Sequence, residues 1–286
     1  MNRSTYFAGN RRCLNIIEMS SELTLQTEAD QLAQQLFGHH NKKCARFASR
    51  LLEMCTKVQD KDFLLIHNPG GWGSTPLEHC LEWERSIVEG VKSTIERLGY
   101  SSFVTQHLRG GRSWWAHLWD AREQLRFLFK GTSTRAKILA AELMFITRHL
   151  DSLQVILVGA SQGAAFGNTV MRQMGEFRRV YSIELGIIFV HMSRRVVTER
   201  TLVIDGNGLM PDPIAHRDLW AGFRTYATAP FRWGQCLLRG KPRKLSDCIN
   251  VPGHEYNWEY PEVHKRIENF LETRFGVKKK AEVGLS

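Results

Sequence analysis

The sequence lacks the features that mark several large classes of protein. No apolar run approaches the roughly 20 residues that cross a bilayer, and no internal repeat or low-complexity segment is present. The first residues lack the apolar centre of a secretory signal, so we expect a cytoplasmic protein. The cysteines show no CxxC spacing, which disfavours a zinc knuckle or a disulfide framework and favours reduced thiols. They are Cys13, Cys44, Cys55, Cys80, Cys236 and Cys248.

What the sequence does contain is an ordinary apolar content and an excess of positive charge. Of its 286 residues, 43% are hydrophobic and 24% are charged, which is typical of a globular protein with a sizeable core. The formal charge of +10 is spread along the chain and does not resemble a nucleic-acid-binding module. A solvated basic surface is the simplest interpretation. Attraction to an anionic membrane surface or to an anionic substrate is the alternative.

Apolar periodicity predicts strands that alternate with helices. Strands are expected at 62–66, 102–108, 154–158, 180–190, 201–205 and 245–251. Helices are expected at 43–59, 77–98, 114–129, 133–150 and 261–275, with one more directly after residue 161. This alternation favours an α/β fold with a mostly parallel central sheet and helices on both faces. We therefore expect one domain over residues 39–276, a loosely ordered N-terminal arm at 1–38 and a basic tail at 277–286. The pattern carries no information on oligomeric state.

The most informative segment is an aliphatic run that leads directly into Gly159-Ala160-Ser161-Gln162-Gly163. This order predicts a strand, a sharp turn and a helix. Glycines flank the serine because larger side chains would collide with the neighbouring strand or helix. The turn lifts Ser161 Oγ clear of the sheet and directs the Gln162 N–H toward any oxyanion that forms there. We interpret it as a nucleophile elbow rather than a structural glycine-rich turn.

A serine hydroxyl needs a base near neutral pH, and the base needs an orienting acid. His254 follows the last predicted strand, and Gly253 allows the backbone to turn its imidazole toward the elbow, so we expect His254 to be the base. Two carboxylates follow the strand at 201–205. Asp212 lies several residues out on the loop, where such an acid normally reaches the histidine, whereas Asp205 could instead cap a turn. We favour Asp212 and keep Asp205 as the alternative acid.

A second oxyanion donor is expected from the loop after an earlier strand. The segment His67-Asn68-Pro69-Gly70-Gly71-Trp72 is the natural candidate. Proline has no amide hydrogen, which leaves Gly70 or Gly71 as the donor beside Gln162. No Gly-Lys-Ser/Thr follows these glycines, so a phosphate cradle is disfavoured, and His67 is expected to brace the loop. We expect no cofactor and no metal.

Together these residues resemble the α/β-hydrolase superfamily of serine hydrolases. The resemblance covers about residues 62–275 and rests on the 67–71 loop, the 159–163 elbow, the 212–214 loop and the 252–254 loop. It departs from the superfamily where His67-Asn68 replaces the usual His-Gly pair, and where no strands are evident before Asp62. A haloalkane dehalogenase or an epoxide hydrolase has an aspartate where Ser161 stands, so the serine disfavours both of these enzyme classes. The pattern assigns no subfamily.

The resemblance implies transfer of an acyl group from a carboxylic ester or thioester to water. Ser161 would attack the carbonyl, His254 would take its proton and Asp212 would stabilise the imidazolium. A cover is expected from residues 109–129 or 213–245, and tryptophans near the loops predict an apolar pocket: Trp72, Trp114, Trp115, Trp119, Trp220 and Trp233. Two alternatives stay open. One is a lipase or phospholipase at a membrane surface, and the other is a non-catalytic binding protein with the same fold.

Overall fold

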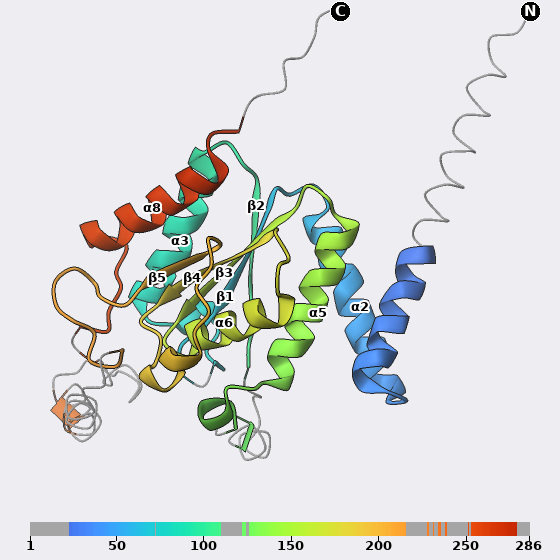
Figure 1. Ribbon diagram of the computed structural model, residues 1–286, viewed down its shortest axis with the longest axis horizontal. Coiled ribbons are helices and arrows are strands. Elements are labelled where there is room, and N and C mark those ends of the chain that lie inside the picture. Colours follow the sequence, from blue (N-terminus) through green and yellow to red (C-terminus); the bar gives the residue numbers. More distant parts are fainter. Residues whose placement is uncertain are drawn as a thin grey trace, which may run out of the picture.

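The protein contains a five-stranded sheet in which every strand pair is parallel (Figure 1). The computed structural model describes residues 23–71, 73–109, 122–123, 126–215, 251 and 253–278, with single positions at 228, 231, 234, 235 and 238. The strands are β1 (Phe63–Asn68), β2 (Ser102–Gln106), β3 (Gln154–Ala160), β4 (Val180–Leu185) and β5 (Thr201–Ile204). Their order is β2-β1-β3-β4-β5, so the direction of winding reverses between β1 and β3. In open parallel sheets, ligands bind beyond the carboxyl ends of the strands at such a reversal.

Helices cover both faces of the sheet, as the sequence predicts. On one face lie α2 (Asn41–Val58), α5 (Thr134–His149) and α6 (Gln162–Met174), and on the other lie α3 (Glu82–Arg97) and α8 (Pro261–Phe275) (Figure 1). The side chains of β1 alternate between two cores. Leu64 and Ile66 pack with the first group of helices, while Phe63 and Leu65 pack with the second. This alternation, repeated in β3, explains why both central strands read as continuous apolar runs.

Several predicted elements differ from the structure at their ends. The helix expected at 77–98 is divided into a 3₁₀ turn, η1 (Leu77–His79), and α3, because Leu81 has an extended backbone with ψ 144°. The strand expected at 180–190 ends at Leu185, because Gly186 turns the chain with φ +52°, and the 3₁₀ helix η2 (Phe189–Arg194) follows. The strand expected at 245–251 lies outside the described residues except for Val251, which is not in a strand.

Part of the expected N-terminal arm is a packed helix. Residues 23–37 are helical, and Ala29 and Ala33 are fully buried in the core beside α2 and α5. The expectation of a loose arm is therefore wrong for this stretch. Small side chains allow close helix contact, and the many polar residues between them hide the apolar stripe in the sequence. Residues 1–22 and 279–286 lie outside the described part of the chain.

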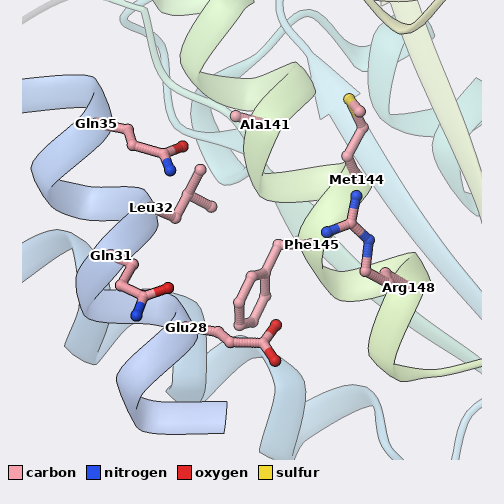
Figure 2. Close-up of a pocket in the computed structure, with 8 residues that line it drawn as sticks. All are labelled: Glu28, Gln31, Leu32, Gln35, Ala141, Met144, Phe145 and Arg148. Atoms are coloured by element: carbon pink, nitrogen blue, oxygen red, sulfur yellow. The ribbon is translucent and has the colours of Figure 1, made fainter. Parts of the chain in front are cut away.

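A hollow of about 420 Å³ lies between the helix at 23–37 and α5 (Figure 2). Its lining is a mixture of polar and apolar side chains: Glu28, Gln31, Leu32, Gln35, Ala141, Met144, Phe145 and Arg148. None of these residues belongs to a loop that follows a strand, so this hollow is separate from the carboxyl edge of the sheet. No helix in the described ranges combines the length and the apolar character needed to cross a bilayer.

Candidate active site

Ser161 lies in a strained turn between β3 and α6. Its φ of 52° and ψ of −115° make it the only non-glycine residue with positive φ among those described. A Cβ at Gly159 would lie 2.6 Å from Gly163 C, and a Cβ at Gly163 would lie 2.0 Å from Asn68 O. Both flanking glycines are thus required by the close approach of α6 to β3 and to the end of β1. A serine held in this conformation is a local strain of the kind that clusters at functional sites.

His254 and Asp212 form a close, mostly buried pair. His254 Nδ1 lies 2.7 Å from Asp212 Oδ2, and Asp212 is fully buried. The Tyr256 hydroxyl donates to the same carboxylate oxygen over 2.5 Å, and the backbone N–H of Ile214 donates to Oδ1 over 2.8 Å. Burial alone would raise the pKa of the Asp212 carboxyl, but the hydrogen bonds from His254, Tyr256 and the backbone hold it below its usual value. The acid is therefore ionised near neutral pH.

Gly186 brings this pair to the same point of the sheet edge as the serine. The Ser161 N–H donates to the carbonyl of Leu185, the last residue of β4, over 2.8 Å. A Cβ on the next residue, Gly186, would lie 2.4 Å from Asp212 Oδ2 and 2.6 Å from the Tyr256 hydroxyl. Only a glycine leaves room for the acid there. Within the described ranges, Ser161 Oγ has no hydrogen-bond partner, and this includes His254.

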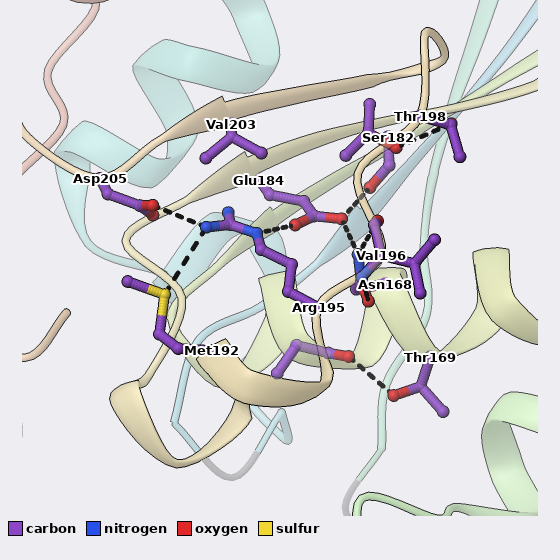
Figure 3. A network of polar contacts seen from close by, with 12 residues as sticks. Asn168, Thr169, Ser182, Glu184, Met192, Arg195, Val196, Thr198, Val203 and Asp205 are labelled. Atoms are coloured by element: carbon purple, nitrogen blue, oxygen red, sulfur yellow. Dashed lines mark hydrogen bonds and ion pairs between the residues drawn. The ribbon is translucent and has the colours of Figure 1, made fainter.

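Asp205 belongs to a different network (Figure 3). Arg195 joins two acids, with Nη1 donating to Asp205 Oδ2 over 2.6 Å and Nε donating to Glu184 Oε2 over 2.7 Å. Glu184 is fully buried and also accepts from Asn168 Nδ2 over 2.8 Å. Burial raises the pKa of Glu184, while Arg195 and Asn168 oppose that rise. The structure thus brings Asp212 to His254 and directs Asp205 to Arg195.

The two candidate glycines of the oxyanion loop differ in their surroundings. The Gly70 N–H is directed at Glu84 Oε2 over 3.4 Å. No described residue accepts from the Gly71 N–H, and Gly71 has φ +52°. Gln162 begins α6, where the first N–H groups have no acceptor within the helix. The arrangement therefore leaves the amides of Gln162 and Gly71 free to receive an anion, whereas that of Gly70 is engaged.

Buried polar groups behind the loop complete this region. His67 is 2% exposed, and its Nε2 lies 3.2 Å from Glu84 Oε2 while the Gln106 amide nitrogen lies 3.3 Å from its Nδ1. His67, Glu84 and Cys80 form a group whose ligand atoms lie within 4.8 Å of one another, close enough to hold a metal ion. Because the Gln106 nitrogen can only donate, it leaves the imidazole proton on Nε2, facing Glu84. The imidazole is thus fully hydrogen-bonded by protein groups.

A cavity of about 170 Å³ opens beside these groups and reaches the oxyanion loop. Its lining comes from the loop and from the start of α3: Pro69, Gly70, Gly71, Thr75, His79, Cys80, Leu81 and Glu84. Burial, and secondarily the Glu84 charge, raise the pKa of the Cys80 thiol to about 12, so this thiol is neutral near pH 7. The tryptophans expected to line an apolar pocket lie outside the described residues.

Four residues of this region were not singled out from the sequence: Glu84, Arg109, Gly186 and Tyr256. Glu84 had a usable signal, because buried positions Trp83, Glu84, Ile87 and Val88 follow helical spacing and place a carboxylate on the inner face of α3. Tyr256 follows His254 by two residues, but nothing local indicates that its hydroxyl reaches Asp212. Arg109 lies shortly after the end of β2, the strand beside β1, yet the carbonyls that its side chain binds are 38 to 53 residues away in the chain.

Comparison with known proteins assigns no family: no family model matches the chain, and no curated protein matches it significantly.

Proposed function

We propose that this protein is a serine hydrolase that transfers the acyl group of a carboxylic ester or thioester to water. Ser161 is the nucleophile, His254 the base and Asp212 the acid that orients the base. The observation that carries the proposal is the 2.7 Å contact between buried Asp212 and His254, beside the strained serine. A buried carboxylate on one imidazole nitrogen, with a serine held in an unfavourable backbone conformation nearby, is the arrangement that nucleophilic catalysis needs.

The chemistry follows from the hydrogen bonds. Asp212 accepts from His254 Nδ1–H, which leaves Nε2 as the nitrogen that can take a proton. Ser161 Oγ bonds to the substrate carbonyl carbon as Nε2 takes its proton, and the carbonyl electrons move to oxygen. The amides of Gln162 and Gly71 bind that oxyanion. The carbonyl then re-forms, the alcohol or thiol leaves with the proton from Nε2, and water repeats the cycle on the acyl-serine. Tyr256 and the Ile214 amide keep Asp212 ionised throughout.

One observation favours a second function. The absence of a hydrogen bond between Ser161 Oγ and His254 is what a non-catalytic binding protein of this fold would show. Contacts of this kind are often long in free enzymes and shorten only when substrate binds, so the hydrolase remains our first proposal. In the hydrolase, binding of substrate is expected to bring the imidazole to the hydroxyl.

A different observation favours action at a membrane surface. Leu209 and Met210 are 66% and 47% exposed on the loop that leads to Asp212. Met210 Cγ would lie 3.1 Å from a Cβ at Gly253, the neighbour of His254, so the apolar pair stands beside the proposed site. Exposed apolar side chains on a chain of net charge +10 suit contact with anionic lipid. A lipase or phospholipase would therefore hydrolyse esters faster on anionic vesicles, and the gain would fall with added salt.

The deciding experiment is labelling of the purified protein with a fluorophosphonate, with Ser161→Ala and His254→Ala beside the wild type. We expect the wild type to be labelled and both variants to fall to background, and Ser161→Ala to lose hydrolysis of short p-nitrophenyl esters with its fold intact by circular dichroism. A well-folded wild type that resists the probe would favour the binding protein. Labelling that persists in Ser161→Ala would remove Ser161 from the mechanism.

A further inference from the structure

Arg109 is a fully buried cation that contacts both sides of the proposed oxyanion hole. It is 2% exposed, and it is the largest fully buried side chain among the described residues. Its Nη2 donates to the carbonyls of Pro69 and Gly71 over 2.5 and 3.2 Å, and its Nη1 donates to the carbonyl of Gln162 over 3.2 Å. Its own backbone N–H donates to Gly73 O over 2.6 Å. One guanidinium thus joins the loop after β1 to the first residue of α6.

The surroundings of Arg109 fix the plane of the guanidinium. A Cβ at Gly73 would lie 2.4 Å from Arg109 Nε, so the loop leaves space for this side chain only because a glycine stands there. On another side, the Phe166 ring lies with its centroid 5.3 Å from the guanidinium carbon. Burial lowers the pKa of Arg109 to about 9, and the Glu84 charge opposes the shift, so the group is still charged near pH 7. A planar cation is held here in one orientation.

We infer that Arg109 is a positioning residue that presets the oxyanion hole, an inference that rests on the proposed hydrolase function. The two amide donors, Gly71 and Gln162, come from separate segments, so their spacing depends on whatever joins those segments. The rigid fork of arginine binds carbonyls on both and stops them from moving independently. Donors fixed before the reaction stabilise an oxyanion without reorganisation. The buried positive charge acts in the same direction, because it stabilises the negative charge that develops on the oxyanion.

The test compares Arg109→Lys and Arg109→Met with the same changes at Arg200. Arg200 is also buried, at 8% exposed, and it also donates to backbone carbonyls, those of Gly175, Phe177 and Val180. Gly175 caps the far end of α6, so Arg200 is a matched control at the opposite end of the same helix. For each variant we would measure kcat, KM, the rate of fluorophosphonate labelling, the pH profile of kcat/KM and the melting temperature.

We expect Arg109→Met to lower kcat and the labelling rate by about 10²-fold, comparable with the loss of one oxyanion donor, and Arg109→Lys to lower both by about tenfold. KM and the midpoint of the pH profile should stay near the wild-type values, because neither substrate binding nor the Asp212–His254 pair is changed. The Arg200 variants should lower the melting temperature without this loss of kcat. If Arg109→Met does not fold, Arg109→Lys and Phe166→Leu, which removes the ring under the guanidinium, supply the same comparison.

Equal losses of kcat at Arg109 and Arg200 for an equal fall in melting temperature would overturn the inference, since a global loosening would then explain both. Wild-type kcat in a folded Arg109→Lys would also overturn it, and in that case the labelled wild type would leave the proposed hydrolase standing. A wild type that is not labelled at all would contradict the hydrolase and this inference together. The outcomes therefore separate the two proposals.

Discussion

At the scale of single residues, both carboxylate oxygens of Asp212 accept hydrogen bonds from protein groups. Oδ2 accepts from His254 and Tyr256, and Oδ1 accepts from the backbone N–H groups of Ile214 and Ala215. Burial together with the neighbouring carboxylate raises the pKa of the Tyr256 phenol, which keeps that hydroxyl a donor at any ordinary pH. The three donors other than His254 fix the position of the carboxylate. Because the carboxylate in turn binds His254 Nδ1, the imidazole has little freedom to turn away from it.

We expect Asp212→Asn to lower kcat/KM for an ester by roughly 10³–10⁴-fold, because an amide in this place favours the wrong imidazole tautomer. Asp205→Asn breaks the contact with Arg195 instead, and its cost should be less than tenfold. Steady-state hydrolysis of a p-nitrophenyl ester by the two variants gives the comparison. A larger loss of kcat/KM in Asp205→Asn than in Asp212→Asn would identify Asp205 as the acid instead.

At the scale of elements, the sequence predicts best where a single period covers a whole segment. The helix expected at 261–275 is found at those residues, and α5 and β3 lie within two residues of their expected bounds. The prediction fails where apolar residues continue past a backbone turn. Ile187 and Ile188 extend the apolar run of β4, but the positive φ of Gly186 has already ended the strand, and no local pattern reveals it.

In the candidate site, too, the sequence predicts some features and misses others. The elbow, His254 and Asp212 can be identified from the sequence, because each lies in a short motif after a predicted strand. The partner of each group cannot. Asp205 pairs with Arg195 ten residues earlier, and the Gly70 amide pairs with Glu84 from a neighbouring helix. Such contacts depend on how elements pack together, so they become visible only in three dimensions.

Two glycines of α6 test whether the close approach at the elbow is required. A Cβ at Gly163 would collide with the backbone of Asn68, so we expect Gly163→Ala to destabilise the fold by about 1–3 kcal/mol and to abolish labelling of Ser161. Gly167, one turn later, is the control. Its nearest contact would be Ser182 Oγ at 3.5 Å, so Gly167→Ala should stabilise the helix by roughly 0.5–1 kcal/mol. Chemical denaturation gives both values, and equal effects of the two changes would contradict the steric explanation.

At the scale of the whole molecule, half-buried His107 and buried His191 tie stability to pH. His107 stacks on Phe166 at 5.2 Å between ring centroids, and His191 packs against Phe127 at 4.6 Å. Burial lowers the pKa of His107 to about 3 and that of His191 to about 4, and the charges of nearby arginines contribute to both shifts to a smaller extent. In the unfolded chain both would take up a proton near pH 6.5. The unfolded state therefore binds more protons below that pH, and folding stability falls as the pH is lowered from about 6.5 toward 4.

We expect His107→Phe to flatten this dependence by about 1.4 kcal/mol per pH unit between pH 6 and 4, since phenylalanine keeps the ring contact and takes up no proton. Urea unfolding at several pH values measures the slope, and exposed His39→Gln serves as the control. A slope unchanged in His107→Phe, or changed equally in the control, would show that the acid sensitivity arises elsewhere.

The strained backbone at Ser161 has a consequence for descent. Glycine adopts a positive φ freely, so replacing the serine with glycine would relieve about 1–3 kcal/mol of strain. A lineage with no use for the hydroxyl would gain stability from that exchange, and drift would favour it. In descendants released from selection on the hydroxyl, we therefore expect glycine to replace serine at position 161 before the rest of the fold changes.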